Sequence, residues 1–206
     1  MKNLLKTSIF FICSSFLFSP LFAADSAGNR ADSSILIGYQ TGAHLATMIA
    51  PPLRIGTFVG DWEIALDMGS NSWTNTEGST SGVATYKNQG LNTRYFVGNS
   101  FNILAAIHNR EYSAKVTETS GSNTYSGTLD AKATVATFGI GNHWLMDWGL
   151  YIGADWFMAG SALSSSSTAA GDFTTSGKED VEKMGEFVNA VSTAGGFFVF
   201  TVGFAF

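Results

Sequence analysis

Apolar and polar residues alternate with a period of two along most of the chain. From Trp62 to Met68 every second residue is apolar, and the same alternation recurs from Phe101 to Ile107. A period of two puts successive side chains on opposite faces of an extended chain, so each such segment predicts a β-strand. Eight segments show the pattern, near residues 33–41, 52–59, 62–73, 84–97, 101–119, 124–142, 149–162 and 194–206.

The connectors between these segments differ in length. Gly60-Asp61 and Gly98-Asn99-Ser100 are short, whereas residues 74–83 and 163–178 are longer and rich in Ser, Thr and Gly. Short turns at one end and long loops at the other are typical of an up-and-down barrel that crosses a membrane. The predicted fold class is therefore all-β, an eight-stranded antiparallel up-and-down transmembrane β-barrel.

The short turns determine which residues lie opposite each other in neighbouring strands. A two-residue turn at Gly60-Asp61, with Gly first as a type II′ turn prefers, pairs apolar residues with one another along the strands on either side. On the other face the same turn places Arg54 directly opposite Asp67. Turns at residues 98–100 and 121–122 give the same agreement between apolar faces.

The charged residues of the strands gather on the second face. We name this set the lumenal network, and it consists of Arg54, Glu63, Asp67, Arg94, His108, Arg110 and Asp155. The apolar face carries no charge over residues 53–68 and 91–107, and an unpaired charge facing hydrocarbon near the bilayer midplane costs about 2–4 kcal/mol. The apolar face is therefore predicted to face lipid. The network and the bulky Phe58, Phe96, Tyr151 and Phe157 are predicted to fill the interior.

The start of the chain predicts a signal for export. Lys2 and Lys6 precede an apolar run that ends near Phe22, and the small pair Ala23-Ala24 follows. This order is typical of a secretory signal peptide, and the run is shorter than the ~20 residues that a spanning helix needs. We therefore expect residues 1–24 to be a signal peptide and residues 25–206 to form the outer-membrane barrel domain.

Composition and charge exclude several classes of function. Charged residues make up 13% of the 206 residues, about half the roughly 25% usual for a soluble domain. The formal net charge of −5 argues against nucleic acid as a partner. The single cysteine, Cys13, lies in the predicted signal peptide. We therefore expect no disulfide, no thiol catalysis and no cysteine-ligated metal in the mature protein.

The three histidines are the candidates for catalysis or metal binding. None stands at metal-ligand spacing from another His, Asp or Glu on a shared face, so neither a metal nor another cofactor is expected. His108 points inward, but spacing places no nucleophile beside it. His44 is expected in the first outer loop and His143 in a turn at the opposite end, with surface or interface placement for both. No catalytic residue is predicted.

Two features go beyond a minimal barrel. The segments 101–119 and 124–142 are almost twice the ~9–11 residues that a bilayer requires, so their hairpin is predicted to project. Glu111 lies opposite Lys132 in that hairpin, outside the apolar band. In the last long loop, apolar residues recur at helical spacing after a capping-box pattern, which predicts a short amphipathic helix near residues 177–191.

The last segment carries the most specific motif. Apolar residues alternate to the final position, at Phe198, Phe200, Val202, Phe204 and Phe206. This ending resembles the C-terminal assembly signal of bacterial outer-membrane barrels. Over residues 25–206 the layout resembles the small eight-stranded barrels of the OmpX, OmpA-domain and OmpW type, although no internal motif selects one of them.

The resemblance implies a location in the outer membrane of a Gram-negative cell envelope. It also implies outer-membrane lipid, periplasmic chaperones and the barrel assembly machinery as partners, with an extracellular ligand or surface as a further one. An eight-stranded barrel leaves an interior that side chains just fill. The predicted function is accordingly that of a closed barrel with a protruding hairpin, acting in envelope structure or surface interaction.

Two other functions stay open. The first alternative is a porin-like narrow channel for small molecules of the OmpW kind. The second, less favoured, is a lipid-modifying enzyme. The His-x-Ser pair that marks the lipid A deacylases reads His108-Asn109-Arg110 in this chain. The protein is therefore predicted not to be an enzyme.

Overall fold

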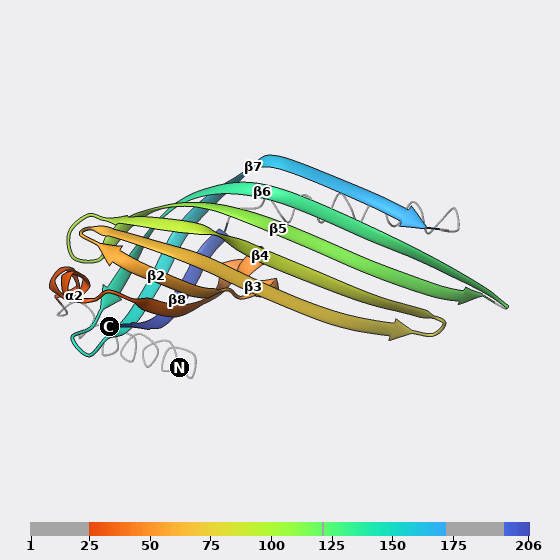
Figure 1. The fold of residues 1–206 in the computed structure, drawn as a ribbon, viewed down its shortest axis with the longest axis horizontal. Coiled ribbons are helices and arrows are strands. Elements are labelled where there is room, and N and C mark those ends of the chain that lie inside the picture. The colour runs from red at the N-terminus through yellow and green to blue at the C-terminus, as the bar shows by residue number, and fades with distance from the viewer. Residues whose placement is uncertain (1–24, 121, 172–195) are drawn as a thin grey trace, which may run out of the picture.

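The computed structural model describes residues 25–120, 122–171 and 196–206. They form eight strands and two short helices, which are α2 (Ser26–Asp32), β1 (Leu36–His44), α3 (Leu45–Ile49), β2 (Leu53–Val59), β3 (Trp62–Glu77), β4 (Thr80–Phe96), β5 (Phe101–Ser120), β6 (Asn123–Leu145), β7 (Leu150–Gly171) and β8 (Gly196–Ala205). Each strand pairs antiparallel with the next, and β8 pairs with β1, so the sheet closes into a barrel (Figure 1). The predicted fold class is confirmed. The predicted signal peptide and loop helix lie outside the described residues.

The register predicted from the turns is confirmed. Arg54 lies opposite Asp67 in the β2–β3 pair, and Tyr95 lies opposite Ile103 in the β4–β5 pair. Gly60 has a φ of 59°, which is the left-handed conformation that the first central position of a type II′ turn requires. A short turn therefore carries enough information to align two strands for their whole length.

Side chains on the two faces of the barrel differ as the alternation predicts. Large apolar residues point outward along every strand, for example Leu66 at 54%, Ile107 at 53% and Phe200 at 52% exposure. The inward positions between them are buried and hold the polar and charged residues together with small, aliphatic and aromatic ones. The barrel is thus apolar outside and charged inside, the reverse of a water-soluble barrel.

One predicted interior residue lies on the outer face. Gly141 pairs with Asp155 and Ile140 with Phe157, so Trp156 is an extra residue in β7 and forms a β-bulge. The bulge reverses the alternation beyond it. Phe157 is therefore 46% exposed on the outside, whereas Met158, which simple alternation places outside, is 7% exposed and points inward.

Five of the strands continue past the closed barrel. Pairing with β2 stops at Met68 of β3, and pairing of the described part of β8 stops at Met158 of β7. Beyond these residues β3 to β7 run on as an open sheet, which we name the extension (Figure 1). The sequence predicted projection only for the β5–β6 hairpin. Apart from the turn at Gly78-Ser79, the predicted loop 74–83 is strand, and so are the first residues of the predicted loop 163–178.

Candidate functional site

The centre of the lumenal network is an ion pair across β2 and β3. The Arg54 guanidinium donates from Nε to Asp67 Oδ1 at 2.8 Å and from Nη2 to Asp67 Oδ2 at 2.9 Å. Both side chains are completely buried in the barrel. This two-bond geometry is the strongest form of arginine–carboxylate contact, and it follows directly from the register of the Gly60-Asp61 turn.

Glu63 joins two of the three arginines of the network. Its Oε1 accepts from Arg54 Nη1 and from Arg94 Nη1, each at 3.1 Å. Arg94 also donates from Nη2 to Asp155 Oδ2 at 2.7 Å, which connects β4 to β7 across the interior. Asn92 adds a further link between β4 and β3, because its side-chain amide donates to Asp67 Oδ2 at 3.1 Å. Strands β2, β3, β4 and β7 are thereby cross-linked by charge.

His143 completes this arrangement, although the sequence placed it in a surface turn. Strand β6 extends to Leu145, so His143 points inward and is fully buried. Its Nδ1 lies 2.6 Å from the Tyr151 hydroxyl and its Nε2 lies 3.0 Å from Asp155 Oδ1. The Tyr151 hydroxyl itself donates to Glu63 Oε2.

The Tyr151 hydroxyl connects His143 to Glu63. It has one proton, and because it donates that proton to Glu63 it accepts from His143 Nδ1. The His143 ring therefore links Asp155 of β7 to Glu63 of β3 through the Tyr151 hydroxyl.

The remaining two members of the predicted network lie nearer the extension. His108 Nε2 faces Asp67 Oδ2 at 3.3 Å and so touches the central group. Arg110 lies beside that group, with its Nη2 at 3.3 Å from His44 Nε2. His44 is the last residue of β1 and is 3% exposed, so its predicted position in an outer loop is wrong. The seven predicted residues are thus all buried. Six of them are linked to one another by hydrogen bonds and ion pairs, and Arg110 lies next to this group.

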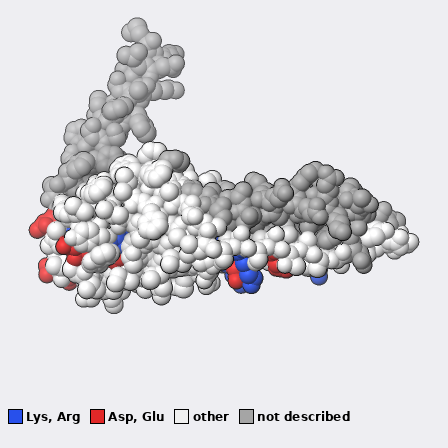
Figure 2. Space-filling model, turned by 90° about the horizontal axis from the view of Figure 1, so that it is seen from above, with Lys and Arg blue, Asp and Glu red and all other residues white. Residues whose placement is uncertain are grey.

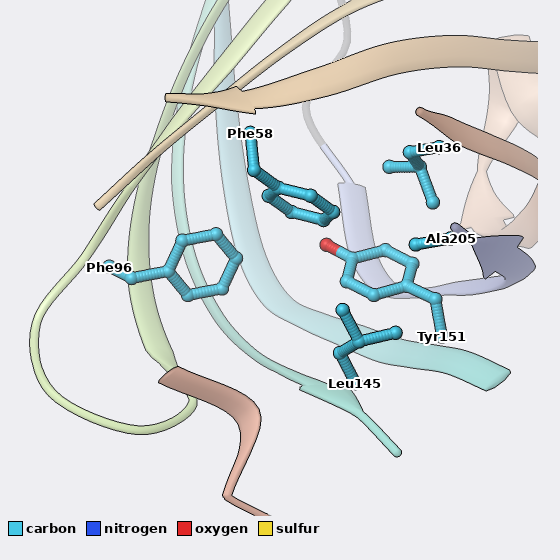
Figure 3. Close-up of a cluster of buried hydrophobic side chains, with 6 residues drawn as sticks. All are labelled: Leu36, Phe58, Phe96, Leu145, Tyr151 and Ala205. Atoms are coloured by element: carbon cyan, nitrogen blue, oxygen red, sulfur yellow. The ribbon is translucent and has the colours of Figure 1, made fainter. Parts of the chain in front are cut away.

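Helix α2 closes the end of the barrel that carries the short turns, which we name the turn end. Arg30 lies 3.8 Å over the Phe96 ring and donates to the carbonyl oxygens of Gly98 and Asn99. Burial lowers the pKa of the Arg30 guanidinium. Beneath the helix, six buried residues fill the barrel (Figure 3), namely Leu36, Phe58, Phe96, Leu145, Tyr151 and Ala205. Phe58 and Tyr151 meet edge to face, with ring centroids 6.0 Å apart.

Helix α3 packs at the other end of the closed barrel. Its residue Ala46, together with Ala50 just after the helix, is fully buried against Tyr86 on the inner side of β4. Neither helix was predicted from the sequence. The sequence does contain an N-cap residue that could have predicted the start of α2, since the Asp25 side chain accepts from the Gly28 backbone N–H. The five residues of α3 are too few to show a helical period.

A small cavity lies inside the barrel, between α3 and the lumenal network. Its volume is about 30 Å³, which is room for one or two water molecules, and Asn88, His108 and Thr137 are part of its lining. Across the described residues there is no group of three or more His, Cys, Asp or Glu placed to hold a metal ion. None of the helices described is long and apolar enough to cross a membrane.

Similar shapes occur among solved structures. A major outer-membrane protein of Thermus thermophilus has a TM-score of 0.49 and 10% identity, and the match covers 84% of this chain and 99% of that one. Acinetobacter baumannii CarO2 has a TM-score of 0.47 and 12% identity, with coverage of 84% and 99%. Acinetobacter baumannii CarO has a TM-score of 0.36 and 11% identity, with coverage of 84% and 96%. No protein-family model and no curated protein matches the chain.

The chain has the architecture of an eight-stranded outer-membrane β-barrel. That statement follows from the closed ring of antiparallel strands, the apolar outer face and the charged interior. The architecture predicted by resemblance is confirmed.

Proposed function

We propose that the protein is an integral protein of a bacterial outer membrane with a closed interior, and that it displays the extension outside the cell. The observation that supports the membrane location best is a belt of outward apolar residues with a sharp upper edge. On β5 the outward residues are apolar from Phe101 to Ile107, and the next two are Asn109 and Glu111. The apolar residues suit contact with the hydrocarbon of a bilayer, and the polar residues that follow suit contact with headgroups or water.

The edge of the belt runs level across neighbouring strands. Leu91, Ile107 and Ala136 lie side by side in one row of the sheet. One step further toward the extension the row is Gln89, Asn109 and Thr134. The face of the barrel seen in Figure 2 is largely free of charge, with charged residues at the turn end and on the extension. The apolar band therefore extends across β4, β5 and β6 and is not confined to one strand.

Three successive layers support a closed interior. Arg30 and the aromatic cluster fill the turn end, the lumenal network spans the middle, and α3 packs against Tyr86 at the other end. A channel would need all three layers to move, and the middle one consists of buried ion pairs. A lipid-modifying enzyme is disfavoured for the same reason, since His143 and its partners have no contact with lipid or solvent. A role in envelope structure or surface interaction fits this molecule best.

Labelling of single cysteines tests the proposed orientation, because Cys13 is the one cysteine of the chain. In intact cells we expect a polymer-linked maleimide too large for porins to label Ser113→Cys, which lies on the extension. Asp61→Cys, in a turn at the opposite end, should react only after the outer membrane is permeabilised. Leu66→Cys, within the belt, serves as the control and should react only in the unfolded protein. Labelling of Asp61→Cys in intact cells, with Ser113→Cys protected, would reverse the orientation.

A further inference from the structure

The extension carries a hollow on the side that continues the inner face of the barrel. The hollow has a volume of about 420 Å³ and is formed by β3, β4 and β5. We name it the cup. Its volume falls in the range of about 300–1,000 Å³ typical of small-molecule sites. It is separate from the lumenal network, which lies within the closed barrel.

Small residues make the floor of the cup and aromatic residues make its walls. Gly82, Ala84 and Ala114 lie next to one another on β4 and β5, where larger side chains would fill the space. Trp73 and Tyr112 stand beside this floor, with ring centroids 6.3 Å apart and ring planes at 48°. Trp73 is 40% exposed, so part of its indole surface is open to a ligand.

The polar groups of the cup are neutral. Asn75 and Thr80 line it from β3 and β4 and supply an amide and a hydroxyl. Lys115 also lines it, but it alternates with Ala114 and Val116 along β5, so its charged side chain belongs to the opposite face of the sheet. A neutral ligand with an apolar face and a polar edge matches this combination better than an ion or a hydrocarbon does.

We propose that the cup binds a pyranose ring of an extracellular glycan. One face of a pyranose presents C–H groups, which are attracted to the negative face of an aromatic ring, as Trp73 and Tyr112 provide. The hydroxyls at its edge can exchange hydrogen bonds with the Asn75 amide and the Thr80 hydroxyl. This inference rests on the proposed function, because a glycan outside the cell reaches the cup only if the extension is extracellular.

Saturation-transfer NMR on the full chain refolded in lipid nanodiscs tests the proposal. The probes are the methyl pyranosides of glucose, galactose, mannose and N-acetylglucosamine, with cyclohexanol as an apolar ring of similar size. We expect transfer to the ring C–H protons of at least one glycoside. Trp73→Ala should weaken that binding about five-fold through loss of one aromatic contact. Trp148→Ala removes another exposed indole, at the turn end, and should leave it unchanged.

Gly82→Leu provides a second variant, which places a larger side chain in the cup. A Cβ at Gly82 would meet its nearest neighbours at ordinary distances, 3.7 Å from the Lys115 carbonyl oxygen and 3.8 Å from Val116 Cγ2. The variant should fold, as heat-modifiable gel mobility would verify, and should lose glycoside binding. Transfer to cyclohexanol alone, equal transfer in Trp73→Ala, or no transfer to any glycoside would overturn the proposal. If Ser113→Cys is labelled in intact cells while glycosides fail to bind, the glycan inference falls and the proposed orientation stands.

Discussion

Replacing Asp67 with Ala is expected to destabilise the barrel by about 3 kcal/mol, because the substitution leaves a buried guanidinium without its main partner. Arg54 would keep only its 3.1 Å contact with Glu63. The double variant Arg54→Ala/Asp67→Ala should cost less than the two single changes summed, since it removes both charges together. Urea unfolding in detergent measures all three free energies of unfolding.

A matched control for this cycle exists in the same sheet. Glu111 and Lys132 also lie directly opposite each other, with 3.4 Å between Glu111 Oε1 and Lys132 Nζ. Their side chains, however, are 47% and 65% exposed. Water screens this pair, so its coupling should stay below about 1 kcal/mol. Equal coupling for the buried and the exposed pair would show that burial of the lumenal network adds nothing to the stability of the barrel.

Replacing Gly153 with Ala is expected to lower the free energy of unfolding by a similar amount, through the contacts of His143 with Tyr151 and Asp155. A Cβ at this position would lie 2.3 Å from His143 Nδ1, closer than any real contact. The imidazole ring would have to leave the site where it bonds Tyr151 and Asp155, and overpacking of a rigid interior costs about 1–3 kcal/mol before those bonds are counted. We expect a total loss of about 3 kcal/mol in the free energy of unfolding.

A second substitution shows whether the ring causes this loss. His143→Ala should itself be destabilising, because it removes one hydrogen-bond partner from each of the fully buried Asp155 and Tyr151. In His143→Ala/Gly153→Ala the clash is gone, so adding the Gly153 change should cost little. If Gly153→Ala destabilises equally with and without the ring, the backbone of β7 and not the histidine requires the glycine.

The alignment of the strands could be predicted from the sequence because the turns are local. Gly60-Asp61 joins two strands through adjacent residues, and each pair beyond it follows by counting. The inward position of Arg54 and Asp67 followed from the same counting. Local information therefore determines the part of the candidate site that lies near the turn.

What the sequence did not reveal depends on contacts between distant residues. The bulge at Trp156 is defined by the partner strand, which places Gly141 opposite Asp155. His143 points inward because β6 continues to Leu145, further than its alternation indicates. The Ser-rich half of β7 has no apolar face to reveal a strand, because beyond the membrane belt neither of its faces must meet lipid. Each case needs a pairing partner that the local pattern does not contain.

Ion conductance across a planar lipid bilayer tests the closed interior most directly. The refolded protein should insert and give no current steps, because α2, the lumenal network and α3 block the barrel in succession. Protease protection of the inserted barrel verifies that insertion took place, and a general porin added afterwards verifies that the membrane reports open pores. Reproducible unit steps whose size rises with the salt concentration would contradict the account and would identify the barrel as a channel.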